Sequence, residues 1–162
     1  MIYEFRTYTT APGKAPELAK LSGEIGRRLH DLIYKNYMVL ELEQTFVEPF
    51  RLRPPLSVPQ RYIGTGKVIA AGSRFAAYSG DTAVGQRNTK LIAELMKSRD
   101  PDGYLGAMPA EPGGLQNYRM WTLHEQESVI MGLVENYRYC EDTKSLQFAR
   151  NLADYVIETF SK

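Results

Sequence analysis

The stretch KVIAAGSRFAAYSGDTAVGQRNTKLIAELMK, residues 67–97, predicts two helices joined by a tight turn. Its first part is apolar on most faces and rich in small residues, which is typical of a buried, closely packed helix. After Ser79-Gly80, Asp81-Thr82 opens a second segment whose apolar residues recur at helical spacing on one face. We therefore expect a helical hairpin, with helices over residues 63–78 and 82–97.

The same pattern returns further along the chain. Shifting the sequence by 61 positions, the difference between 142 and 81, places Asp142-Thr143 on Asp81-Thr82 and Leu152 on Leu91. The periodicity predicts two more helices, over residues 125–139 and 144–160. Successive αα-hairpins of this kind build an α/α toroid, in which the first helix of each hairpin is the inner one. The predicted fold class is all-α: a partial α/α toroid of two αα-hairpins, with N-terminal helices and a short N-terminal strand.

Residues before the hairpins divide into an arm and a connector. The run 1–10 alternates and is rich in β-branched and aromatic residues, which predicts the short strand. Apolar residues at helical spacing follow, and the prolines of residues 54–59 then predict an extended, solvated connector. We expect three parts: 1–50, a strand and helical arm; 51–61, a Pro-rich connector; and 62–162, the partial toroid.

Composition excludes several classes of function. A net charge of +1 gives no basis for binding nucleic acid, and no apolar stretch is long enough to span a membrane. The alternating, charged N-terminus is not a secretory signal, so we expect a cytoplasmic protein. The only cysteine, Cys140, is expected to be buried and structural, and it cannot form a disulfide within the chain. His30 and His124 lack chelating spacing, so no metal site is predicted.

The candidate site is the loop that joins the two hairpins, predicted over residues 97–123. Asp102 marks a turn, Tyr104 offers a ring with a hydroxyl, and Trp121 adds a second ring of the kind that sugars stack on. His124 is expected at the start of the next inner helix, within reach of Tyr104 or Asp102. The alternative is a surface connection with a capping aspartate and a histidine that caps its own helix.

These residues carry a family resemblance. Asp102-Gly103-Tyr104-Leu105-Gly106, then His124-Glu125, Gly132-Leu133-x-x-Asn136-Tyr137 and Ala149-x-x-Leu152-Ala153-Asp154 resemble the N-terminal part of the β-L-arabinofuranosidase-type glycoside hydrolases of family 127, over about residues 21–162. The resemblance implies an (α/α)6 barrel that cleaves L-arabinofuranosides with a cysteine nucleophile on a zinc held by cysteines and a glutamate. It also implies that His124 contacts the sugar. The family often has His-Glu-Leu-Tyr where this chain has His124-Glu125-Gln126-Glu127.

In that family the catalytic cysteine, the zinc ligands and the acid/base glutamate lie in later barrel repeats than those matched here. We therefore expect a fragment of a glycosidase barrel that has no cofactor of its own, zinc belonging to a longer form. It would bind an arabinoside-type sugar through His124, Tyr104, Asp102 and Trp121 without hydrolysing it. An open inner face is also expected to favour a homo-oligomer.

Two other functions stay open. The opening MIYEFRTYTTAPGKAPEL resembles NIPSNAP-type proteins over about residues 1–20, which implies a dimeric ferredoxin-like binding module. Such a module requires at least four strands. A non-catalytic carbohydrate-binding or helical interaction protein would use the same cluster of Tyr104, Trp121 and His124 without chemistry.

Overall fold

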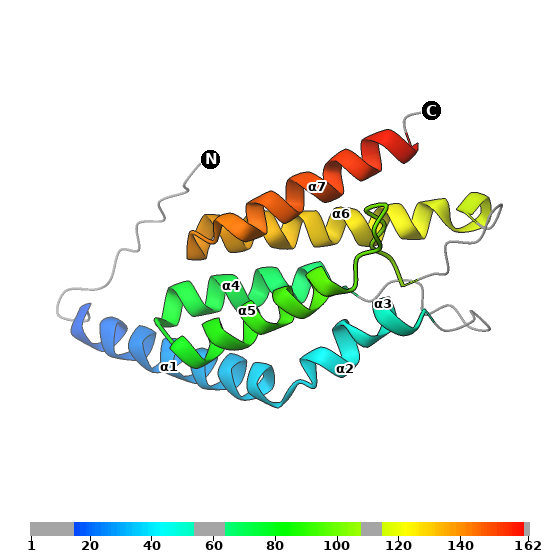
Figure 1. Cartoon of the computed structure of the whole chain (residues 1–162). Coiled ribbons are helices and arrows are strands. Elements are labelled where there is room, and N and C mark those ends of the chain that lie inside the picture. Colours follow the sequence, from blue (N-terminus) through cyan, green and yellow to red (C-terminus); the bar gives the residue numbers. More distant parts are fainter. Residues whose placement is uncertain (1–14, 54–63, 108–114, 161–162) are drawn as a thin grey trace. The chain divides into compact units, whose positions relative to one another are not determined.

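The computed structural model describes residues 15–53, 64–107 and 115–160; side chains are described from residue 23 in the first helix and from residue 122 in the sixth. These residues form seven helices and no strand (Figure 1), so the predicted all-α class is confirmed. The helices are α1 (Ala15–Val39), α2 (Leu42–Phe46), α3 (Glu48–Leu52), α4 (Thr65–Ser79), α5 (Thr82–Lys97), α6 (Leu115–Cys140) and α7 (Thr143–Phe160). The strand predicted over residues 1–10 and the NIPSNAP-like opening lie outside the described side chains.

The chain divides into two compact units, Met1–Met38 and Val39–Lys162. The second unit contains α2 and α3 together with the four helices that follow them. Arg51 of α3 holds them there: its Nη1 donates to Glu43 Oε1 of α2 at 2.9 Å, and its Nη2 donates to Glu94 of α5. Most of the predicted connector, residues 54–61, lies outside the described residues, and its first residues are helical.

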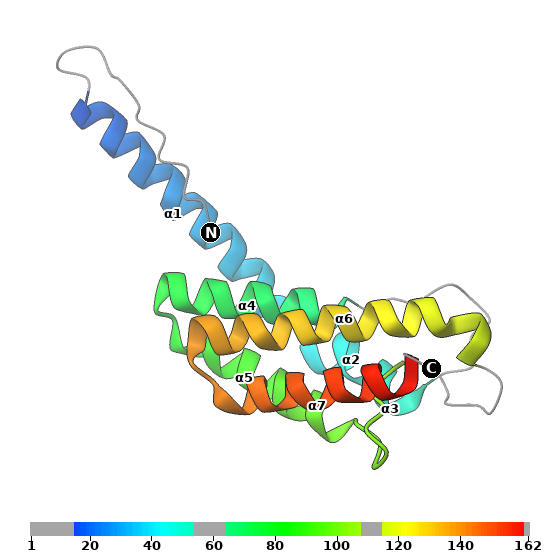
Figure 2. The same cartoon turned by 90° about the horizontal axis from the view of Figure 1, so that it is seen from above.

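Two successive hairpins, α4–α5 and α6–α7, form the second unit's body (Figures 1 and 2). The predicted bounds of α5 agree with the structure, and those of α4 and α7 differ by one or two residues. The repeated Asp-Thr pair has a physical basis, because each aspartate caps the second helix of its hairpin. Asp81 Oδ1 accepts from the amides of Ala83 and Val84, at 2.8 and 3.2 Å, and Asp142 Oδ1 accepts from the Lys144 amide at 3.1 Å.

The inner helices α4 and α6 lie side by side and run in the same direction, as a toroid requires (Figure 2). Glycines allow the close approach. A Cβ atom on Gly66 would lie 1.7 Å from the Ser128 carbonyl oxygen, and one on Gly132 would lie 2.3 Å from the Gly66 carbonyl oxygen. Neither position has room for a side chain. The prediction of a closely packed helix over residues 67–78 is therefore confirmed.

A buried polar network ties the four body helices together. The Asn136 side chain of α6 accepts from Ser73 of α4 at 2.9 Å and from Asn88 of α5 at 3.1 Å. Its amide nitrogen donates to Ser145 of α7 at 2.9 Å and to Asp142, the α7 cap, at 3.2 Å. Because buried polar groups are costly without partners, this network fixes one arrangement of the two hairpins.

The apolar core lies among the same four helices and continues into the loop that joins the hairpins. Leu152 of α7 is fully buried, as its place on the amphipathic face predicted. Other fully buried side chains of the core are Ile69, Val84, Leu95, Val129 and Leu133. No helix in the described residues is long and apolar enough to cross a membrane.

Candidate functional site

Helix α6 begins about ten residues earlier than predicted. It starts at Leu115 rather than near residue 125, so residues 115–123 are helical and the predicted loop is much shorter. The sequence explains the difference, because the breakers Pro112, Gly113 and Gly114 precede good helix formers. His124 therefore lies within the helix, and the prediction that it stands at a helix N-terminus is wrong.

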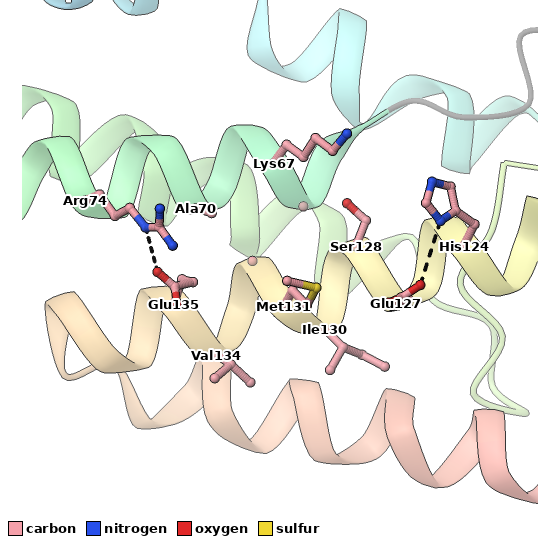
Figure 3. Close-up of a pocket in the computed structure, with 12 residues that line it drawn as sticks. Lys67, Ala70, Arg74, His124, Glu127, Ser128, Ile130, Met131, Val134 and Glu135 are labelled. Carbon is pink, nitrogen blue, oxygen red and sulfur yellow. Dashed lines mark hydrogen bonds and ion pairs between the residues drawn. The ribbon is translucent and has the colours of Figure 1, made fainter. Parts of the chain in front are cut away.

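A groove of about 380 Å³ runs along α4 and α6 (Figure 3). His124 lines it, together with residues of α6 that follow at helical spacing, and α4 supplies the facing wall. Apolar atoms of Ala70, Met131 and Val134 form its middle part, and charged side chains stand at its ends. The lining set is Gly66, Lys67, Ala70, Arg74, His124, Glu127, Ser128, Ile130, Met131, Gly132, Val134 and Glu135.

One end of the groove combines hydrogen-bond donors with an acceptor. His124 Nδ1 lies 3.7 Å from Glu127 Oε2, one helical turn further along α6, and both side chains are exposed. Lys67 of α4 lies at the same end in Figure 3. The separation of His124 and Glu127 is an ion-pair distance, and it is too long for a direct hydrogen bond.

The other end of the groove is closed by an ion pair across the two inner helices. Arg74 Nε of α4 donates to Glu135 Oε2 of α6 at 2.6 Å (Figure 3), and Arg138 Nη1 lies 3.8 Å from Glu135 Oε1. The hydrogen bond that Arg74 donates to Glu135 raises the pKa of Arg74 above its usual value, so Arg74 stays cationic. The Arg74 guanidinium also lies 5.8 Å from the centre of the Tyr139 ring.

Glu125 has a structural role that sequence reasoning missed. Its carboxylate is almost fully buried and accepts from the amides of Gly64 and Thr65, each at 3.3 Å. These are amides of the α4 N-terminus, which has no acidic residue in its own first turn. The sequence signal for this role is the N-terminus of α4, where Gly64-Thr65 supplies no side-chain cap. The amides there can donate to a carboxylate from another part of the chain, which then serves as their cap. Glu125 is therefore a capping group rather than a site residue.

Tyr104 lies in the core instead of offering a ring to a ligand. It is 1% exposed, and its ring lies over Gly106, where an added Cβ would lie 2.2 Å from the tyrosine hydroxyl oxygen. The Arg53 guanidinium lies 4.9 Å from the ring centre on one side, and the Tyr155 ring lies 6.0 Å away. Burial raises the pKa of Tyr155. The expectation of an exposed stacking face at Tyr104 is therefore wrong.

The other loop residues mainly shape the turn. Asp102 is exposed, and its Oδ1 accepts from the Tyr104 amide at 3.0 Å, as a turn aspartate does. Gly103 takes φ = 102°, which favours glycine. Asp100 accepts from Arg53 Nη1 at 2.6 Å and joins the loop to the end of α3. The side chain of Trp121 lies outside the described residues.

The loop and the groove lie on different faces of α6. Gln126 is fully buried, and its Nε2 donates to the Leu105 carbonyl oxygen of the loop at 3.1 Å. Two helical positions separate His124 from Gln126, which places their side chains about 200° apart around the axis. The structure therefore groups His124 with Lys67 and Glu127, and it does not bring His124 together with Tyr104.

Cys140 differs from the prediction in one respect. It is exposed rather than buried, although its Sγ lies 3.7 Å from the Ser73 carbonyl oxygen. Partial desolvation at the end of α6, and then the charge of Asp142, raise the pKa of the thiol, which disfavours a nucleophilic thiolate. Among the described residues no three His, Cys, Asp or Glu side chains are grouped to hold a metal ion.

Comparison with known proteins identifies the family. The model of the family described as "Beta-L-arabinofuranosidase, GH127 catalytic domain" matches residues 59–162, more than half of the chain. The match covers both hairpins, the loop between them and the groove. No curated protein and no solved structure matches the chain. The chain thus belongs, through these two hairpins, to the β-L-arabinofuranosidase-type glycoside hydrolases of family 127.

Proposed function

We propose that this chain binds an L-arabinofuranoside-type sugar in the groove between α4 and α6, and that it does not hydrolyse the glycoside by itself. The observation that carries the proposal is the position of His124. This is the residue that the family resemblance assigns to sugar contact, and its side chain lines the groove beside Glu127. Sugar recognition therefore belongs to the inner helices rather than to the loop around Tyr104.

The chemistry of the groove suits a small sugar. Its volume of about 380 Å³ falls within the range of small-molecule pockets. A sugar ring has C–H groups that pack on apolar atoms, here those of Ala70 and Met131. Its hydroxyls both donate and accept hydrogen bonds, and the polar end offers donors at Lys67, an acceptor at Glu127 and an imidazole at His124.

Binding without hydrolysis follows from how the carboxylates are used. Retaining glycosidases hold a nucleophile and an acid/base group at a fixed separation around one bond. In the described part of α6, Glu125 is buried as a cap and Glu135 is bound to Arg74, which leaves Glu127 as the exposed carboxylate of the groove. Cys140 lies outside the groove lining, and no step is assigned to zinc.

The test is a titration with methyl L-arabinofuranoside, followed by saturation-transfer NMR. We expect weak binding by the wild-type chain and at least a tenfold loss in His124→Ala. Two matched variants serve as controls: His30→Ala removes the other histidine, and Asp102→Ala alters the loop. Neither is expected to change binding. An unchanged titration in His124→Ala, or a loss confined to Asp102→Ala, would overturn the proposal.

Hydrolysis is measured separately with an aryl arabinofuranoside. We expect release of the aryl group at the rate seen in buffer, with or without added zinc. Zinc-dependent turnover by the 162-residue chain would refute the claim that it does not act alone.

A further inference from the structure

The carboxylates of α6 near the groove have different environments. Glu125 is almost fully buried and accepts from two backbone amides, at 3.3 Å each. The side chain of Glu135 is only 16% exposed and accepts from Arg74 at 2.6 Å. Both groups already have strong partners within the protein, so neither is available to a ligand without breaking the fold's own contacts.

Glu127 is the contrasting case. Its side chain is 66% exposed, and its Oε2 lies 3.7 Å from His124 Nδ1. Figure 3 shows the two side chains next to each other at the polar end of the groove, with Lys67 across from them on α4. An ionised carboxylate is a pure acceptor. Glu127 therefore presents acceptor oxygens to whatever occupies this end.

The spacing of these groups fits neighbouring hydroxyls of one ring. Because 3.7 Å is too long for a direct hydrogen bond, one hydroxyl can lie against His124 and the next can donate to Glu127. Hydrogen bonds to a carboxylate are roughly twice as strong as those between neutral groups. A ligand with a carboxylate at the same place would instead meet a like charge, which is a repulsive element of specificity.

We propose that Glu127 determines the specificity of the groove for a neutral sugar, by accepting a hydrogen bond from the hydroxyl next to the one at His124 and by repelling a ligand carboxylate at this end of the groove. This inference rests on the proposed sugar binding. It assigns a ligand contact to the position where this chain has glutamate and the family pattern His-Glu-Leu-Tyr has tyrosine. A tyrosine hydroxyl carries no charge at neutral pH, so it would not exclude an anionic sugar.

A double-mutant cycle tests the contact directly. The ligands are methyl L-arabinofuranoside, its 2-deoxy and 3-deoxy analogues, and the corresponding uronate with a carboxylate at C5. The proteins are the wild type, Glu127→Ala, Glu127→Gln and the control Glu158→Gln, which changes an exposed glutamate on α7. Because Glu127 and Glu158 are exposed, far-UV circular dichroism and thermal unfolding are expected to match the wild type in every variant.

We expect Glu127→Ala to weaken binding of the parent glycoside about tenfold, the effect of losing one hydrogen bond to a charged group. One deoxy analogue should bind the wild type about tenfold more weakly than the parent does. That analogue and the parent should bind Glu127→Ala equally well, because the lost hydroxyl and the lost carboxylate are partners. Glu127→Gln should bind the uronate more tightly than the wild type does, and Glu158→Gln should change nothing.

The outcomes separate the inference from the function on which it rests. No binding of the parent glycoside by the wild-type chain would refute the proposed function. Binding with purely additive effects of both deoxy analogues and Glu127→Ala would refute the contact while leaving sugar binding intact. A uronate that binds the wild type and Glu127→Gln equally would refute the exclusion of anionic sugars.

Discussion

Replacing Gly66 by alanine tests how closely α4 packs against α6. The added Cβ would lie 1.7 Å from the Ser128 carbonyl oxygen, 2.1 Å from its carbonyl carbon and 2.6 Å from the Val129 amide nitrogen. All three atoms belong to the α6 backbone, so no side chain can rotate to make room. The two helices would have to separate by roughly 1.7 Å to reach ordinary van der Waals contact, which begins near 3.4 Å.

The free energy of unfolding should fall by about 2–4 kcal/mol. Overpacking of a core costs about 1–3 kcal/mol, and backbone atoms that cannot rotate place this case at the upper end or beyond. Alanine gains about 1 kcal/mol over glycine in helix propensity, which offsets part of the loss. Separation of α4 and α6 would also strain the contacts of the polar network at Asn136.

Gly85→Ala is the matched control. It is the same substitution within a helix, on α5, and its added Cβ would meet only the Ala76 Cβ, at 3.9 Å. This variant should gain about 0.5–1 kcal/mol, because glycine is the less favourable residue in a helix interior. Urea unfolding, followed by circular dichroism at 222 nm, measures both variants. If Gly66→Ala is as stable as Gly85→Ala, the close crossing of α4 and α6 is refuted.

Three further predictions concern the core, the polar network and the thiol. In urea unfolding, Leu152→Ala should lower the free energy of unfolding by about 2–5 kcal/mol. Ile157→Ala, at a side chain that is 61% exposed, should lower it by less than about 1 kcal/mol, and similar values for the two variants would mean that this face of α7 is not core. Asn136→Ala should cost about 2–4 kcal/mol because it removes one hydrogen-bond partner from each of the buried side chains Ser73, Asn88 and Ser145 on three other helices. Gln147→Ala, on an exposed pair, should stay within about 0.5 kcal/mol, and equal losses would contradict the network. Cys140 should react with iodoacetamide more slowly in the native chain than in the same chain in urea. The reaction rate of the native chain should rise only at higher pH, because the raised pKa of the thiol means that the thiolate forms there. A faster reaction of the native chain would contradict this.

The helices could be predicted from sequence because their signals are local. Asp81 and Lys97 mark the ends of α5, and the repeated Asp-Thr pair located α7. The start of α6 is not evident from the sequence, because residues 115–123 also suit the predicted site loop although they contain good helix formers. Helix α6 packs on several sides, so its apolar residues do not form the single clear face that periodicity detects.

The site could be predicted only in part, because the direction of a loop side chain is a tertiary property. His124 was found through the family resemblance, and it does line a groove. The sequence predicts Tyr104 in the site because an aromatic ring between two glycines suits a binding loop as well as a core. The space above Gly106 and the guanidinium of Arg53 bury that ring instead. The sequence does not single out Glu127, because nothing local distinguishes a glutamate that lines a groove from an ordinary glutamate on the solvated surface.

The proposed sugar site lies between α4 and α6 and not at the loop around Tyr104. Methionine labelled with ¹³C at the methyl group tests it, since Met131 lines the groove and Met96 of α5 does not. On titration with methyl L-arabinofuranoside, the Met131 methyl signal should shift in a saturable way while that of Met96 stays fixed. A fixed Met131 signal, with shifts instead at the backbone amides of Tyr104 and Leu105, would contradict sugar binding between α4 and α6.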